Sequence, residues 1–315
     1  MGTTEDVVAD LDGTLVCGFT GGAIVRLDPH AGTLTTVADT GGRPLGLEAC
    51  DDGRVLVCDA HKGLLEVDQS TGAVEPLVEQ VDGVPLRFCS NAVAAPEGTV
   101  WFTESTDRFD FEHYMGALLE HRPSGRLFRR DPDGTVTTVL DGLYFPNGVT
   151  LAPDNSSLLF TETGNYSLSR LWLTGSRSGE VDVLLSNMSG FPDNMSRFVD
   201  GRSWIAMTNP RNATLDRSAR WPGLIRSAIW RLPDTLRPDP KTIVWAVCVD
   251  SDGQVVDEVR GVHPSFDTVT GAVERDDTLY LASVWQDSLL SVDLRDRDPE
   301  EVARRVTAAN SLWRP

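Results

Sequence analysis

The chain has 315 residues, a hydrophobic content of 40% and a formal net charge of -19 at pH 7. This length suits one large domain or two small ones, and the composition is that of an ordinary soluble globular protein. The negative charge opposes binding to the phosphates of nucleic acids, so we expect no nucleic-acid partner.

No stretch of about 18 apolar residues exists, so we expect no membrane span. The first residues, MGTTEDVVADLDG, lack the basic and apolar regions of a secretory signal. The five cysteines are an odd number without CxxC spacing, which favours free thiols in a reducing compartment. We therefore predict a cytoplasmic protein.

A unit of short strands separated by turns recurs along the chain. Each copy has an apolar strand, a turn of the Asp-Gly kind, a second strand, a turn of the G-x-L-x-x-x-D kind and a further strand. The six copies begin at Val7, Asp51, Pro96, Pro153, Val199 and Glu274. The runs are short, β-branched or apolar, and bounded by turn residues. Helical periodicity is limited to a possible short helix near 300–305.

Six similar units of four antiparallel strands predict an all-β fold, a six-bladed β-propeller. A β-sandwich is the alternative, but it does not require six similar units. Because no linker or low-complexity tract interrupts the chain, we predict that residues 1–315 form a single domain.

Two copies carry long insertions, at 105–124 and 210–225. Connections at one end of a propeller form the mouth of its central pocket, so aromatic insertions there would cover a ligand. The alternative is that their side chains pack against neighbouring blades. The substrate-binding residues predicted from these insertions are Phe109, His113, Tyr114 and Trp221.

Two oxygen-bearing side chains occupy the same place in their copies. Asn147 precedes the turn residue Asn155 by eight positions, and Asp193 precedes the turn residue Gly201 by eight. Each residue would begin the innermost strand of a blade, beside the central axis. The sequence therefore predicts that both side chains point toward that axis.

The same offset extends to other copies. Glu5 lies eight residues before the turn glycine of copy one, and Asn91 lies seven before that of copy three. Copy two offers Leu45 or Gly46 at this place, and copy six offers Val269 or Thr270. Four of the six places therefore carry a carboxylate or a carboxamide.

Convergent carboxylates need a partner, because without a cation at least one of them would take up a proton. Two carboxylates, two amide oxygens and water suit one Ca²⁺ ion in the central channel. No His or Cys shares the offset, which argues against zinc. We predict a metal site made of Glu5, Asn91, Asn147 and Asp193.

The segment GLYFPNGVTLAPDNSSLLFTETGNYSLSRLWL and its continuation to FPDN resemble the signature region of strictosidine synthase-like proteins, relatives of the gluconolactonase and regucalcin family. The resemblance extends to RPLGLEACDDG, DAHKGLLEVD and ERDDTLYLAS. It implies a six-bladed propeller. It also implies that Glu5, Asn91, Asn147 and Asp193 hold Ca²⁺, with Asp193 acting as the base or nucleophile.

The sequence departs from the family at three places. Gluconolactonase-type members carry an Arg where this chain has Cys89. The catalytic Glu of plant strictosidine synthase falls near Thr270, and a His of bacterial relatives falls at Asp267, with His263 close by. Thr270, Asp267 and His263 are therefore further candidates for contact with substrate.

These observations favour a calcium-dependent hydrolase of lactones or carboxylic esters that acts on a small molecule. A bound cation would stabilise the developing oxyanion, and Asp193 would activate water or attack directly. No Gly-x-Ser-x-Gly motif is present, so a serine mechanism is not expected. The alternatives are a biosynthetic enzyme that condenses an amine with an aldehyde, and a propeller that only binds a partner.

Overall fold

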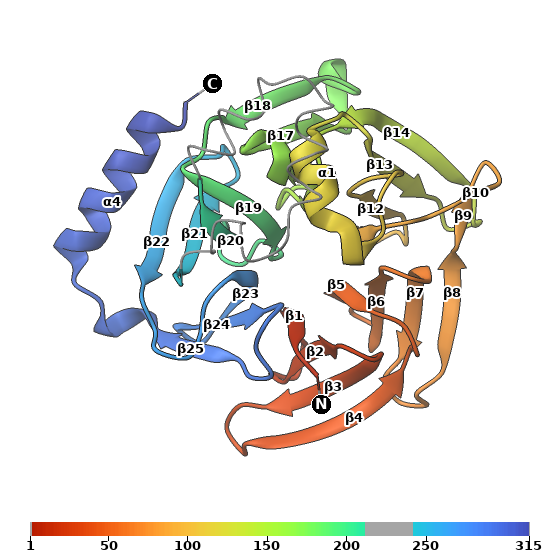
Figure 1. The fold of residues 1–315 in the computed structure, drawn as a ribbon, viewed down its shortest axis with the longest axis horizontal. Coiled ribbons are helices and arrows are strands. Elements are labelled where there is room, and N and C mark those ends of the chain that lie inside the picture. Colours follow the sequence, from red (N-terminus) through yellow and green to blue (C-terminus); the bar gives the residue numbers. More distant parts are fainter. Residues whose placement is uncertain (1, 212–241, 315) are drawn as a thin grey trace.

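The computed structural model describes residues 2–211 and 242–314, and antiparallel sheets are arranged in it around a central axis (Figure 1). A seven-stranded sheet has the order β23-β24-β1-β2-β3-β4, with β25 paired to β24. Four further sheets have four strands each, in the orders β5–β8, β11–β14, β15–β18 and β19–β22. The short pair β9 and β10 forms a separate ribbon.

The strands of the seven-stranded sheet are β1 (Thr4–Ala9), β2 (Leu15–Phe19), β3 (Ala23–Asp28), β4 (Thr33–Asp39), β23 (Val269–Arg275), β24 (Thr278–Ser283) and β25 (Leu290–Asp293). Those of the next sheet and the ribbon are β5 (Pro44–Ala49), β6 (Arg54–Asp59), β7 (Gly63–Asp68), β8 (Val74–Val78), β9 (Gln80–Val81) and β10 (Val84–Pro85). The others are β11 (Cys89–Ala94), β12 (Val100–Glu104), β13 (Gly125–Arg130), β14 (Val136–Leu143), β15 (Pro146–Leu151), β16 (Ser157–Glu162), β17 (Ser167–Trp172), β18 (Val181–Leu185), β19 (Gly190–Met195), β20 (Arg202–Pro210), β21 (Val244–Asp250) and β22 (Val255–Gly261).

The turns between the first two strands of the sheets are where the sequence places them. Five residues in these turns have φ between 55° and 95°: Gly13, Gly53, Gly98, Asn155 and Gly201. Glycine and asparagine tolerate this left-handed conformation, which explains why these residue types mark each copy.

The first strands of the sheets form a ring around the axis. In ring order they are β1, β5, β11, β15, β19 and β23, and each contacts the next. β23 also contacts β1, and Thr4 of β1 pairs with Ser283 of β24, so the ring closes. This arrangement is a β-propeller and confirms the predicted all-β propeller fold.

Hydrophobic side chains fill the space between neighbouring sheets. The largest fully buried ones include Trp204, Trp245, Phe102, Phe128 and Phe160. Helix α4 (Pro299–Leu312) covers β22 at the rim (Figure 1). It begins with proline at its first position, and the Asp298 carboxylate accepts a hydrogen bond from the Glu300 N–H at 2.9 Å. The predicted short helix is thus confirmed and is longer than expected.

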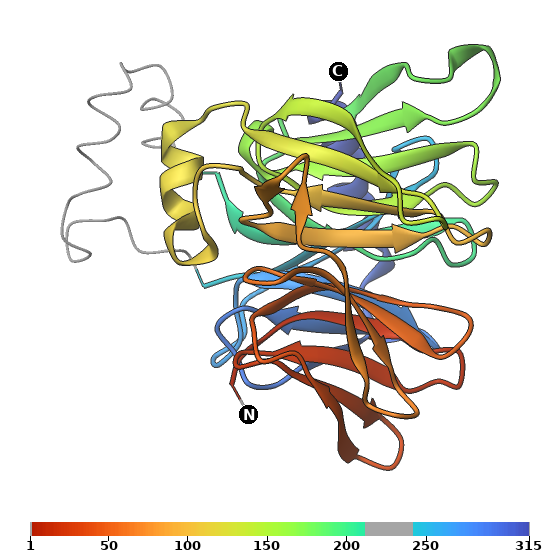
Figure 2. The same ribbon diagram turned by 90° about the vertical axis from the view of Figure 1, so that its right-hand side faces the viewer.

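The insertion at 105–124 forms the 3₁₀ turn η1 (Phe111–His113) and helix α1 (Tyr114–Glu120). Figure 2 shows α1 standing on one face of the propeller, and Figure 1 shows it beside the central axis. Elsewhere in the described residues, 3₁₀ turns are η2 (Thr163–Asn165), η3 (Gly175–Arg177) and η5 (Leu294–Asp296). Within 2–211 and 242–314, no helix has the length and apolar character needed to cross a bilayer.

Candidate functional site

Five of the six axial strands share one pairing irregularity, β23 has a similar one, and these irregularities define which residues are equivalent. In β1, Thr4 pairs with Phe19, and the next pair is three residues on, between Val7 and Cys17. The same step of three separates successive pairs in β5, β11, β15 and in the last part of β19. The residue just after the pair that precedes this step is Glu5, Leu45, Ser90, Asn147 or Asp193. In β23, where the step is two residues on that strand, the residue between the two pairs is Thr270.

Glu5, Asn147 and Asp193 are therefore at one level of the axis, as predicted. All three are at least nine-tenths buried. The Asn147 amide donates a short hydrogen bond to Asp193 Oδ1 and a second one, at 3.4 Å, to Thr163 Oγ1. Glu5 is near enough to Asp193 to raise its pKa. The site therefore brings together two carboxylates and one carboxamide.

Both carboxyl groups hold protons more strongly than usual. Burial raises the pKa of Glu5 to about 7, although the nearby Arg43 guanidinium lowers it. Burial, followed by the negative charges of Glu5 and Asp6, raises the pKa of Asp193 well above its ordinary value. The Asn147 amide and the Asn194 backbone N–H oppose this rise in the Asp193 pKa. Without a cation, the site is therefore short of positive charge.

The predicted place of Asn91 is wrong by one residue. Ser90, not Asn91, follows the first pair of β11, so Ser90 is the equivalent of Asn147. Asn91 Oδ1 accepts a hydrogen bond from Val149 N at 3.3 Å, and its Nδ2 donates to Asn194 Oδ1 at 3.2 Å. The seven-residue spacing before the turn glycine, one short of that in copy one, was the signal of this shift.

Asn91 belongs instead to a second level of the axis with an alternating pattern. In ring order this level reads Asp6, Gly46, Asn91, Gly148, Asn194 and Gly271. A Cβ on any of the three glycines would lie within 2.3–2.4 Å of atoms in the next axial strand. Each glycine thus lets the polar residue of its neighbour approach the axis.

Threonine hydroxyls fix the backbone at the first level, that of Glu5, Asn147 and Asp193. Thr270 Oγ1 donates to the carbonyl of Glu5 at 2.6 Å, Thr103 Oγ1 to that of Asn147 at 2.7 Å, and Thr161 Oγ1 to that of Asp193 at 2.8 Å. Thr270, a predicted substrate residue, therefore lies on the ring, but its hydroxyl is already bound to the backbone.

The turn η1 and helix α1, here called the cap, lie over this site. The Tyr114 side chain is mostly buried, and its pKa is raised by burial and then by the negative charges of Asp193 and Glu5. Phe111 packs against Phe88 with ring centres 5.7 Å apart, and Phe88 packs against Phe145 at 5.3 Å. Beside α1, a small cavity of about 10 Å³ is lined by Leu118, His121 and Phe145 and does not include the axial carboxyl groups.

Other predicted substrate residues have different surroundings. The Phe109 ring packs against Gly116 of α1, and the His113 side chain is 57% exposed and lies 2.5 Å from Asp110 Oδ1. His263 lines a groove of about 430 Å³ between β22, β25 and α4, so it is wrong as a channel residue. Asp267 accepts a hydrogen bond from Thr268 Oγ1 at 2.8 Å. Trp221 lies outside the described residues.

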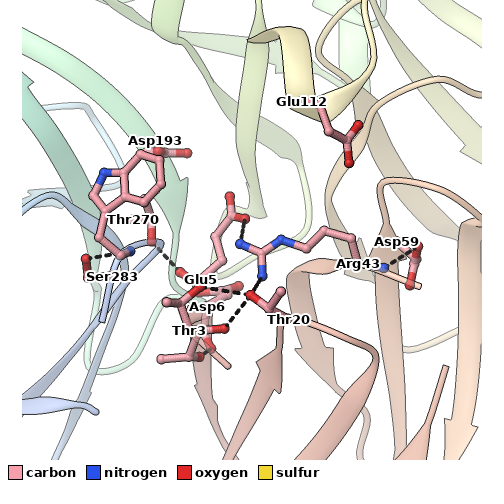
Figure 3. Close-up of polar contacts among 12 residues, drawn as sticks. Thr3, Glu5, Asp6, Thr20, Arg43, Asp59, Glu112, Asp193, Thr270 and Ser283 are labelled. Atoms are coloured by element: carbon pink, nitrogen blue, oxygen red, sulfur yellow. Dashed lines mark hydrogen bonds and ion pairs between the residues drawn. The ribbon is translucent and has the colours of Figure 1, made fainter. Parts of the chain in front are cut away.

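Arg43 is a site residue that the sequence analysis missed. It precedes β5, and its Nη2 lies 3.9 Å from Glu5 Oε2 (Figure 3). In this copy the turn offset selects only Leu45 and Gly46 for the axis. A basic residue two positions before Leu45 does not by itself indicate a place at the axis.

The residues present fit a hard cation. Glu5 Oε2 is buried without a hydrogen-bond partner, and two carboxylates with a carboxamide are oxygen donors of the kind that Ca²⁺ prefers. In the described part of the chain, no group of three or more His, Cys, Asp or Glu side chains forms a ligand set. The candidate ligands are thus Glu5, Asn147 and Asp193, with Ser90 in the place expected for Asn91.

Comparison with known proteins identifies relatives of this chain. A family model described as strictosidine synthase matches residues 91–176. The Arabidopsis thaliana protein strictosidine synthase-like 6 is 32% identical over 82% of this chain and 68% of its own length. Strictosidine synthase-like 13 from the same plant is 39% identical over 64% of this chain, which spans half of that relative's length. The adipocyte plasma membrane-associated protein of Danio rerio is 33% identical over 81% of this chain and 64% of its own.

Solved structures with the same fold are more distant in sequence. A gluconolactonase from Xanthomonas campestris has a TM-score of 0.63 at 17% identity, covering 90% of this chain and 84% of its own. Regucalcin from Agrobacterium tumefaciens, described as a calcium-binding protein, has a TM-score of 0.60 at 18% identity, covering 91% and 85%. These likenesses support the fold.

Proposed function

Because this chain belongs to the strictosidine synthase-like family, we propose that it is a six-bladed propeller enzyme that hydrolyses lactones or carboxylic esters with the help of Ca²⁺. The six blades follow if the seven-stranded sheet is divided between β1 and β24, where one residue pair joins the two halves. Fold and family alone do not determine chemistry, so the proposal depends on the axial site.

One observation carries the proposal: two buried carboxyl groups face the axis, and one of their oxygens, Glu5 Oε2, has no hydrogen-bond partner. Buried charges are retained where a partner compensates them. A hydrolase with a Lewis-acid cation would use both groups, whereas a protein that only binds a partner would not need them.

Each site residue has a role in this proposal. Glu5, Asn147 and Asp193 would hold the cation, which supplies Lewis-acid polarisation of the substrate carbonyl. The Asn147 amide and the Asn194 backbone N–H hold the Asp193 carboxylate in one orientation. Asp193 could then accept a proton from water next to the carbonyl carbon. The cap residues Phe111 and Tyr114 would exclude bulk water.

The condensation of an amine with an aldehyde has less support. The catalytic Glu of plant strictosidine synthase falls near Thr270, whose hydroxyl donates to the backbone carbonyl of Glu5. A hydroxyl at this place carries no negative charge with which to bind an ammonium group.

The test is hydrolysis of phenyl acetate and γ-butyrolactone with added calcium, with EDTA as the control. We expect turnover that EDTA abolishes and calcium restores. Absence of hydrolysis of both compounds by folded, calcium-loaded protein would refute the proposal for simple esters and lactones. Turnover unaffected by EDTA would refute the role of the cation.

A further inference from the structure

One cationic side chain lies beside the two carboxyl groups of the axial site. Arg43 is 5% exposed. Its Nη1 donates a short hydrogen bond to Thr20 Oγ1, and its guanidinium carbon lies 4.9 Å from the centre of the Phe111 ring on the cap. In Figure 3 the guanidinium lies between the Glu5 carboxylate and the Thr20 hydroxyl. A positive charge is therefore held at the site, under the cap.

The hydrogen-bonding capacity of Arg43 is not used up by the protein. Arg43 Nε is buried without a hydrogen-bond partner, and so is Glu5 Oε2. The distance of 3.9 Å between Arg43 Nη2 and Glu5 Oε2 is too long for a hydrogen bond. Leaving a buried donor unpaired is unfavourable, more so on a charged group, so such a donor points to a missing acceptor.

The chain holds Arg43 in place from its backbone. Asp59 is fully buried, and its carboxylate accepts hydrogen bonds from Arg43 N at 3.0 Å, Thr40 Oγ1 at 2.9 Å and His61 N at 2.9 Å. A Cβ on Gly42 would lie 2.4 Å from both Asp59 carboxylate oxygens, so the loop closes tightly onto that carboxylate. The guanidinium is thus presented by a pre-organised loop, as a binding group requires.

We infer that Arg43 is the anion-binding group of this site and takes a carboxylate carried by the substrate. The inference rests on the proposed function in placing this carboxylate on a lactone or ester. A guanidinium matches the two oxygens of a carboxylate in a planar, charge-assisted pair.

The test compares two probes of nearly equal shape and different charge, benzoate and benzamide, by isothermal titration calorimetry on calcium-loaded protein. The wild-type protein should bind benzoate about 10- to 100-fold more tightly than benzamide. This ratio is the gain in affinity usually seen when a hydrogen bond involves a charged group. Arg43→Gln should remove this preference. The matched control is Arg54→Gln on the same sheet, whose side chain is 47% exposed and pairs with Asp52 at 2.5 Å. It should keep the preference.

Two outcomes would overturn the inference: a wild-type protein without preference for benzoate, or an Arg43→Gln variant with the wild-type preference. If Arg43→Gln does not fold, Arg43→Lys keeps the charge and loses the planar fork. The Arg43→Lys variant should still prefer benzoate to benzamide, but less strongly than the wild-type protein. An unchanged preference would refute the planar pairing of the guanidinium with a carboxylate. Failure of the proposed function is separate, because benzoate binding through Arg43 does not require hydrolysis. Conversely, calcium-dependent hydrolysis of neutral phenyl acetate does not require Arg43.

Discussion

Replacing Glu5 by Gln should stabilise the metal-free protein at alkaline pH, although it removes a residue of the candidate site. Two effects compete at this carboxyl group. Burial favours its neutral form, and the Arg43 guanidinium favours its ionised form. Burial is the larger effect, since the pKa of Glu5 rises from 4.5 to about 7. The ionised group is therefore a source of instability in the absence of a cation.

The magnitude follows from this pKa difference. Each pKa unit corresponds to about 1.4 kcal/mol, so ionised Glu5 lowers the free energy of unfolding by about 3 kcal/mol. The pKa of Glu5 is higher in the folded than in the unfolded state. The protein therefore has its full stability below about pH 4.5, where Glu5 is protonated in both states, and it loses these 3 kcal/mol, roughly, as the pH rises through about 7. Glu5→Gln should thus have little effect near pH 4.5 and a stabilising effect above about pH 8.

The measurement is urea unfolding followed by tryptophan fluorescence, at both pH values, in EDTA and in calcium. The control is Glu75→Gln, an exposed position on β8, which should stay within about 0.5 kcal/mol of wild type. In calcium the order should reverse, because the ion stabilises the wild-type protein that binds it better. If Glu5→Gln destabilised the metal-free protein at alkaline pH, attraction to Arg43 would outweigh burial, and the reasoning would fail.

Three further predictions concern catalysis, the cap and the axis. Asp193→Asn should lower kcat for phenyl acetate by about 10²- to 10⁴-fold while calcium still raises the melting temperature, as expected on loss of a general base; near-normal turnover would leave Asp193 a ligand only. Phe88→Ala, which removes a ring packed on Phe111 of the cap, should cost about 3–5 kcal/mol in urea unfolding; a loss under about 1 kcal/mol would show that this cluster does not stabilise the fold. Gly148→Ala would place a methyl group 2.4 Å from Met195 N and should strongly reduce the yield of folded protein; an unchanged melting temperature would contradict this close approach.

The sequence predicted the propeller because each copy repeats the same turn chemistry, and that chemistry depends on local φ values. It predicted Glu5, Asn147 and Asp193 because the distance from a turn to the axis is constant along a strand. It misplaced Asn91 because one residue of difference in spacing changes which side chain faces the axis.

Arg43 could not be predicted in this way, because its place depends on long-range contacts. Its loop is held by Asp59, 16 residues further along the chain, and its charge meets Glu5 from another sheet. The sequence identified the cap as an insertion but did not show that Phe111 would lie over the guanidinium. Contacts between segments distant in sequence leave no local pattern.

Polar residues and glycines alternate at the second axial level, and this alternation requires an even number of axial strands in the ring. Asp6, Asn91 and Asn194 each occupy the space that the preceding glycine leaves open. A ring with one axial strand more or fewer would bring two glycines or two polar side chains together, which would leave a void or cause a clash. Such a propeller could grow or shrink only by two sheets at a time. The repeating unit at this level is therefore a pair of axial strands, present three times, and engineered versions should add or delete such pairs.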